Sequence, residues 1–95
     1  MTPKQRDLAR HALGLPNKKK TAYRNHYCIE PGSPDYLQWE DLVSKKMAVK
    51  ALGGKEWSGD FFYLTFSGAK AALWGDEHLS REVAAKAREL TDMST

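Results

Sequence analysis

The sequence predicts an α+β domain in which two main helices pack on a three-stranded antiparallel sheet, with a protruding hairpin and a C-terminal helix. Two apolar stretches at helical spacing follow capping residues, a β-prone segment lies between them, and two further β-prone segments flank a glycine-rich connection. A chain of 95 residues has room for a single hydrophobic core. We expect the main domain to span 1–75, and the C-terminal helix and tail to span 76–95.

The first helix is expected to begin after Thr2, because Thr2 and Gln5 match the T-x-x-Q pattern of a capping box. Pro3 suits the first helical position, and Gly14 followed by Pro16 is a typical helix end. Apolar residues recur on one face at helical spacing. They are Leu8, Ala12 and Leu15.

A strand is expected over 21–29, the β-prone segment between the two main helices. Successive side chains of a strand point to opposite faces. One face is therefore expected to carry Tyr23 and Tyr27, and the opposite face is expected to carry Arg24 and His26.

The second main helix is expected to have Ser33 as its N-cap and Pro34 at its first position. Acidic residues precede lysines along it, which is the charge order that the helix dipole favours. Its apolar residues recur at helical spacing, and we expect the central one, Trp39, to anchor the helix in the core. They are Tyr36, Trp39, Leu42, Val43 and Met47.

A hairpin is expected next, with strands over 47–52 and 61–66 joined by the glycine-rich segment 53–60. The hairpin is expected to protrude from the domain. Either Thr65 or Ser67 is expected to cap a short helix immediately after the second strand.

Two helices are thus expected after the hairpin. The short one runs through Leu73, and the last one runs from about Leu79 to Leu90. The apolar stripe of the last helix is narrow and rich in alanine, so it offers little area to bury. We therefore expect this helix to be loosely tied to the domain, or to pair with a second copy as a homodimer across a two-fold axis.

The composition is that of a globular protein, with 41% hydrophobic and 28% charged residues. A single cysteine, Cys28, excludes an internal disulfide and favours a reducing compartment. No apolar run approaches the roughly 20 residues that a membrane span needs, and the first residues lack the apolar stretch of a signal peptide. We expect a cytoplasmic protein without a membrane partner.

The sequence offers few residues for catalysis or metal binding. His26 and Cys28 are neighbours with metal-ligand chemistry, but a zinc site needs three or four such ligands. No nucleophile-elbow, phosphate-loop or dinucleotide motif is present. We therefore expect a protein that is not an enzyme and that holds no metal or other cofactor.

Charge is unevenly distributed along the chain. Residues 1–29 contain seven basic residues and one acidic residue, a net charge of +6, and the remainder contains eight basic and eleven acidic residues, a net charge of −3. Such asymmetry indicates a basic surface presented to an anionic partner. The alternative is a solvated N-terminal segment without a partner.

A candidate binding surface follows from this charge pattern and from the residue types of the predicted strand. Arginine, asparagine, histidine and tyrosine side chains suit phosphates and base edges, and they suit a protein hot spot equally well. Lysines in the hairpin can lie along a nucleic-acid backbone, or they can protect an edge strand from aggregation. The candidate residues are Lys18, Lys19, Lys20, Tyr23, Arg24, Asn25, His26, Lys50 and Lys55.

Within residues 39–73, the helix end Leu42–Ala48 (LVSKKMA) leads into the hairpin, whose second strand closes with Tyr63–Gly68 (YLTFSG). In this order the segment resembles the C-terminal half of winged-helix domains of bacterial MarR- and PadR-like regulators. The resemblance implies a winged-helix-like fold with the hairpin as its wing. The chain departs from the family at 17–33, where a strand is predicted in place of the helix that should precede the recognition helix. This departure argues against insertion of a helix into a major groove.

A second resemblance covers the whole chain and rests on Ala12–Leu15, Tyr23–Tyr27, Asp35–Tyr36 with Trp39, and Tyr63–Thr65. With these residues the chain resembles small proteins encoded by tailed phages and prophages, which implies a bacterial cytoplasm as its setting. The predicted function is a phage-type accessory protein that binds nucleic acid without catalysis, through the basic N-terminal surface and the hairpin wing. The alternative is a protein-binding inhibitor or adaptor that targets a bacterial host protein.

Overall fold

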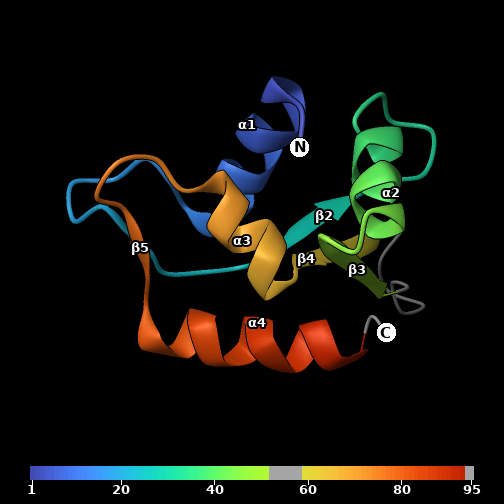
Figure 1. Cartoon of the computed structure of the whole chain (residues 1–95). Helices are drawn as coiled ribbons and strands as arrows, with labels where there is room; N and C mark the ends of the chain where they lie inside the picture. Colours follow the sequence, from blue (N-terminus) through green and yellow to red (C-terminus); the bar gives the residue numbers. More distant parts are fainter. Residues whose placement is uncertain (52–58, 94–95) are drawn as a thin grey trace.

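The computed structural model describes residues 1–51 and 59–93. These residues form four helices, a three-stranded antiparallel sheet in the order β2-β4-β3, and a separate pair of parallel strands, β1 and β5. Helix α3 lies between α1 and α4, and α2 lies beside β3 (Figure 1). The predicted α+β class and the three-stranded antiparallel sheet are confirmed. No helix in this described part of the chain is long and apolar enough to cross a membrane.

Helix α1 (Pro3–Leu13) has the capping box that the sequence predicts. The Gln5 backbone N–H donates to Thr2 Oγ1 at 3.1 Å, and the Thr2 backbone N–H donates to Gln5 Oε1 at 3.0 Å. Gly14 ends the helix with a φ of 80°, a left-handed conformation that favours glycine. The predicted apolar face is buried in the core. It consists of Leu8, Ala12 and Leu15.

The predicted single strand over 21–29 is wrong. Its first residues form β1 (Thr21–Ala22), which pairs in parallel with β5 (His78–Leu79). Its last residues form β2 (Tyr27–Ile29), which pairs antiparallel with β4 (Asp60–Leu64) in the other sheet. The residues between β1 and β2 belong to neither sheet.

Residues 23–26 follow an irregular path because they donate hydrogen bonds to the backbone carbonyls at the end of α1. The last carbonyl groups of an α-helix have no partner within the helix. Backbone N–H groups of this segment donate to the carbonyls of Ala12 and Leu13, both at 3.3 Å. The Arg24 guanidinium donates to the carbonyl of His11 at 2.8 Å. The side-chain alternation expected of a strand is therefore lost in this segment.

The Asn25 side chain takes the place of the missing part of the strand. If the register that pairs Tyr27 with Phe62 continued, Asn25 would lie opposite Leu64. The Asn25 amide donates to the Leu64 carbonyl at 2.9 Å, and its side-chain oxygen accepts from the Leu64 N–H at 2.8 Å. Leu64 is fully buried, so these bonds satisfy backbone groups that water does not reach.

Asn25→Ala is therefore expected to lower the free energy of unfolding by about 1–3 kcal/mol, the range for buried polar groups left without a partner. Chemical denaturation followed by circular dichroism measures the change. His26→Ala, at the exposed neighbouring position, is the matched control, and its free energy of unfolding should change by about 0.5 kcal/mol or less. A wild-type denaturation midpoint for Asn25→Ala would contradict this structural role.

Helix α2 (Tyr36–Ser44) starts later than predicted. Ser33 is not its N-cap, because the Ser33 carbonyl closes a turn by accepting the Tyr36 N–H at 3.0 Å. Asp35 occupies the cap position without a side-chain hydrogen bond. The prediction that Trp39 anchors this helix is confirmed, since Trp39 is fully buried.

Strands β3 (Ala48–Ala51) and β4 form the predicted antiparallel hairpin. Its connection, which includes the candidate residue Lys55, lies outside the described residues. Helix α3 (Phe66–Ala72) follows with Thr65 as its N-cap, since Thr65 Oγ1 accepts the Gly68 N–H at 3.2 Å. A Cβ atom at Gly68 would lie 2.0 Å from a backbone oxygen of the residue before β3, so a side chain does not fit there.

Helix α4 (Arg81–Met93) starts after β5, two residues later than predicted, and packs against α3 and β4 (Figure 1). The Ser80 hydroxyl accepts a backbone N–H of its first turn, and Thr91 Oγ1 accepts the Phe66 N–H at the start of α3, at 2.8 Å. The helix is therefore tied to the domain more closely than its alanine-rich stripe predicts. A second copy would have to bind another face, because the stripe is buried within the chain. The stripe consists of Val83, Ala87 and Leu90.

Candidate functional site

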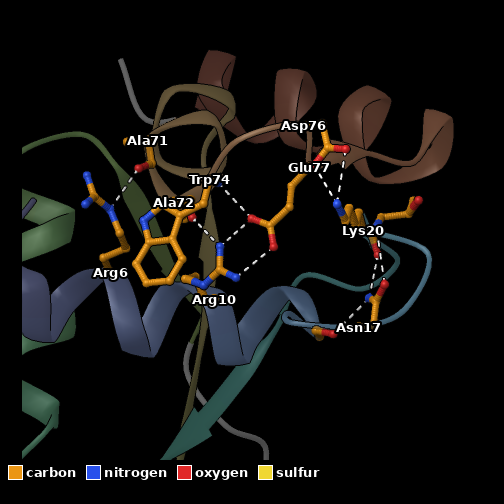
Figure 2. A network of polar contacts seen from close by, with 11 residues as sticks. Arg6, Arg10, Asn17, Lys20, Ala71, Ala72, Trp74, Asp76 and Glu77 are labelled. Carbon is orange, nitrogen blue, oxygen red and sulfur yellow. Dashed lines mark hydrogen bonds and ion pairs between the residues drawn. The ribbon is translucent and has the colours of Figure 1, made fainter.

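Several basic side chains near the N-terminus are held by partners within the chain (Figure 2). The Arg10 guanidinium forms a bidentate ion pair with Glu77, and both side chains are buried. The Arg6 guanidinium donates to the carbonyl of Ala71 at 3.3 Å. The net charge of residues 1–29 therefore overstates the positive charge that is open to a ligand.

Two of the candidate lysines are also paired. Lys20 Nζ lies 3.1 Å from the Asp76 carboxylate, and hydrogen bonding from Lys20 lowers the pKa of Asp76. Lys50 Nζ lies 3.4 Å from the Tyr36 hydroxyl and 3.3 Å from the Glu40 carboxylate, and these hydrogen bonds raise the pKa of Lys50. A phosphate would have to compete with the carboxylate that each lysine already contacts.

Lys18 and Lys19 are exposed on the turn between α1 and β1, and they form no ion pair with the described residues. The turn is fixed by Asn17, whose side-chain amide donates to the Thr21 carbonyl at 2.8 Å. The Tyr23 side chain lies beside the lysines and is 61% exposed. Together these residues line a hollow of about 460 Å³, which we call the lysine hollow. Its lining residues are Asn17, Lys18, Lys19, Thr21 and Tyr23.

A second hollow of about 320 Å³, which we call the arginine hollow, is lined by Arg24, the residue that follows Tyr23 in the sequence. Arg24 joins the two, because its guanidinium lies over the Tyr23 ring, 5.6 Å from the ring centroid. None of the described residues that line the two hollows is acidic. The arginine hollow is lined by His11, Arg24, His26, Tyr27 and Cys28.

The arginine hollow offers hydrogen-bond donors to a ligand. Arg24 Nε is shielded from solvent and makes no hydrogen bond with the described residues, which is uncommon for a polar atom in a folded protein. The Cys28 thiol is exposed in the same hollow. No three His, Cys, Asp or Glu residues within 1–51 and 59–93 are placed to hold a metal ion.

The structure brings part of the predicted site together and separates the rest. The Asn25 side chain is hydrogen-bonded to the backbone of Leu64, and Lys20 and Lys50 form ion pairs with carboxylates. These three side chains are therefore already engaged within the chain. His11 was not among the predicted site residues, although its place in the last turn of α1, next to the predicted strand, was a usable signal. The candidates that line the two adjoining hollows are Lys18, Lys19, Tyr23, Arg24 and His26.

No protein-family model matches this chain, and neither a curated protein nor a solved structure matches it. The resemblance of residues 39–73 to winged-helix domains therefore stays a prediction. The resemblance of the whole chain to phage and prophage proteins stays a prediction as well.

Proposed function

We propose that this chain is a small, non-enzymatic, phage-type accessory protein that binds nucleic acid. The observation that carries the proposal is the surface formed by the lysine hollow and the arginine hollow, where cations flank an exposed tyrosine and no described lining residue is acidic. Phosphates attract lysine and arginine side chains, and an exposed aromatic ring adds a stacking surface for a base.

The proposed layout is winged-helix-like, with α1 and α2 beside the β2-β4-β3 sheet and the β3–β4 hairpin as the wing. The order of helix, strand, helix and hairpin supports this assignment. The wing is not the proposed main contact, because Lys50 already pairs with Glu40. Binding is instead assigned mainly to the N-terminal surface, and the bacterial cytoplasm as its setting follows from the phage resemblance.

Replacing Lys18 and Lys19 together by alanine is expected to weaken binding to all sequences and to flatten its salt dependence. Each phosphate contact contributes about −0.9 to the slope of log K against log[salt] on duplex DNA, and about −0.7 on single strands. Fluorescence anisotropy with labelled duplex DNA, single-stranded DNA and RNA, over a range of salt concentrations, measures both effects. The matched control is the double replacement of Lys70 in α3 and Lys86 in α4, which removes the same charge and should leave the slope unchanged.

A protein-binding inhibitor or adaptor is the second candidate. The exposed Tyr23 beside Arg24 favours it, because tyrosine and arginine are enriched among the residues that dominate protein interfaces. If none of the three labelled probes binds at low salt and micromolar protein, the nucleic-acid proposal is wrong and the protein-binding candidate replaces it.

A further inference from the structure

We infer that the nucleic acid is single-stranded, with one unpaired base stacked on Tyr23 and the phosphates on either side of that base bound in the two hollows. This inference rests on the proposed function and specifies its ligand. It is carried by the position of Tyr23, by the donors on either side of it, and by the charge around it.

Tyr23 is an exposed ring that is nevertheless held in place. It packs directly on Gly14, since a Cβ atom at Gly14 would lie 2.3 Å from Tyr23 Cε1. The Arg24 guanidinium lies over the ring, and the Tyr23 backbone N–H donates to the carbonyl of Leu13 at the end of α1. A ring that is already oriented loses little conformational entropy when a ligand stacks on it.

Cationic and hydrogen-bonding groups line the hollow that contains this ring and the hollow that contains Arg24, its neighbour in sequence. Lys18 and Lys19 share the lysine hollow with Tyr23, and Arg24 and His26 line the arginine hollow that begins at the next residue. A strand whose base stacks on Tyr23 therefore finds donors for the phosphate before that base and for the phosphate after it. The Arg24 guanidinium, whose Nη2 also donates to the carbonyl of His11, is one such donor.

Stacking on Tyr23 requires an unpaired base. In a duplex the faces of each base are covered by its stacked neighbours, whereas a single strand can present a base face to an aromatic side chain. Such stacking depends little on sequence, because every base has a face of this kind. The ligand is therefore a single strand that is bound through its phosphates and the face of one base, without strict sequence preference.

The other exposed aromatic ring in the described part of the chain that lies over an arginine does not offer the same site. Trp74 is exposed and covers the Arg10 guanidinium, 4.2 Å from the ring centroid. The hollow beside Trp74 is also lined by Asp7 and Glu77, and Glu77 already forms an ion pair with Arg10. Its carboxylates would repel a phosphate, so charge complementarity selects the Tyr23 surface.

The test compares Tyr23→Leu, which removes the ring, with Tyr23→Phe, which keeps it. The full chain is titrated into labelled oligothymidylate, an abasic strand of the same length, and a duplex. Tyr23→Leu is expected to weaken oligothymidylate binding by roughly 5- to 150-fold, which is the value of stacking one base, about 1–3 kcal/mol. Tyr23→Phe is expected to bind as the wild type does, and neither variant is expected to change binding of the abasic strand.

The outcomes separate this inference from the proposed function. If Tyr23→Leu leaves oligothymidylate affinity unchanged while the Lys18 and Lys19 double variant weakens it, the stacking inference is wrong and nucleic-acid binding stands. Equal loss on the duplex and the single strand would also overturn the inference. If no probe binds the wild type, the proposed function itself is wrong. Circular dichroism and thermal melting of both Tyr23 variants verify that the exposed substitution leaves the fold intact.

Discussion

Arg10→Ala is expected to lower the free energy of unfolding by about 3–5 kcal/mol, the range for removing one partner of a buried ion pair. Arg10 and Glu77 have side chains only 7% and 9% exposed, and Arg10 Nη2 donates to Glu77 Oε2 at 2.7 Å. Arg10 also donates to the carbonyl of Ala72 at 3.1 Å, and Glu77 accepts the backbone N–H of Trp74 at 2.7 Å (Figure 2). Alanine would leave the Glu77 carboxylate buried without its cation. Chemical denaturation measures the loss.

The matched control for this prediction is the double replacement Arg10→Met with Glu77→Leu. Replacing a buried ion pair by apolar residues of similar volume is often neutral, so the double variant should be more stable than Arg10→Ala. An Arg10→Ala protein with wild-type stability would show that the pair contributes nothing to the fold.

The same pair predicts how stability depends on pH. Hydrogen bonding from Arg10 lowers the pKa of Glu77 below its ordinary value of 4.5. The folded state therefore holds the Glu77 proton less tightly than the unfolded state does. The contribution of the pair is complete above pH 4.5 and is lost as the pH falls through the lowered pKa. The stability difference between wild type and Glu77→Gln should shrink over that acidic window.

Trp39→Ala is expected to lower the free energy of unfolding by about 3–5 kcal/mol, because it empties a large site in the core. The Trp39 ring is fully buried and contacts the rings of Tyr27 and Phe62, with ring centroids 5.2 and 5.5 Å away. It therefore links α2 to two strands of the sheet. A loss of this size is a large part of the 5–15 kcal/mol that stabilises a typical domain.

Trp39→Phe is the control that separates volume from hydrogen bonding. The Trp39 indole Nε1 is buried and makes no hydrogen bond with the described residues, so phenylalanine removes no such bond. Trp39→Phe should lower the free energy of unfolding clearly less than Trp39→Ala does, because phenylalanine keeps most of the ring contact. Denaturation followed by circular dichroism compares the two variants, and equal stability of Trp39→Ala and wild type would contradict the anchoring role.

The elements that the sequence predicts well are those whose signals are local. The capping box of Thr2 and Gln5 lies within α1 itself, and the Thr65 cap lies beside the helix that it starts. The hairpin follows from two β-prone segments that are close in sequence. These features depend on residues within a few positions of each other, so periodicity and capping chemistry identify them.

The errors arise where distant residues decide the structure. The strand expected over 21–29 is divided because β5 supplies the partner of β1, and because the end of α1 takes donors from the residues between β1 and β2. Likewise, part of the +6 charge of residues 1–29 is neutralised by distant carboxylates. Glu77 pairs with Arg10 across 67 positions of sequence, and Asp76 pairs with Lys20 across 56 positions. No local pattern shows such pairings. Tyr23, Arg24 and His26 were nevertheless identified, because their residue types are unusual for a buried strand.

The pairing of β1 with β5 makes the lysine hollow depend on residues far along the chain. The turn that carries Lys18 and Lys19 is bounded by β1, whose ladder partner is residues 78–79. The Lys20 carbonyl also accepts the His78 N–H at 2.9 Å, and the Ala22 carbonyl accepts the Ser80 N–H at 2.9 Å. A nascent chain still short of these residues contains every residue that lines the lysine hollow, but it lacks the strand that pairs with Thr21 at the edge of that hollow. The lysine hollow is therefore not complete until residues 78–80 have been synthesised.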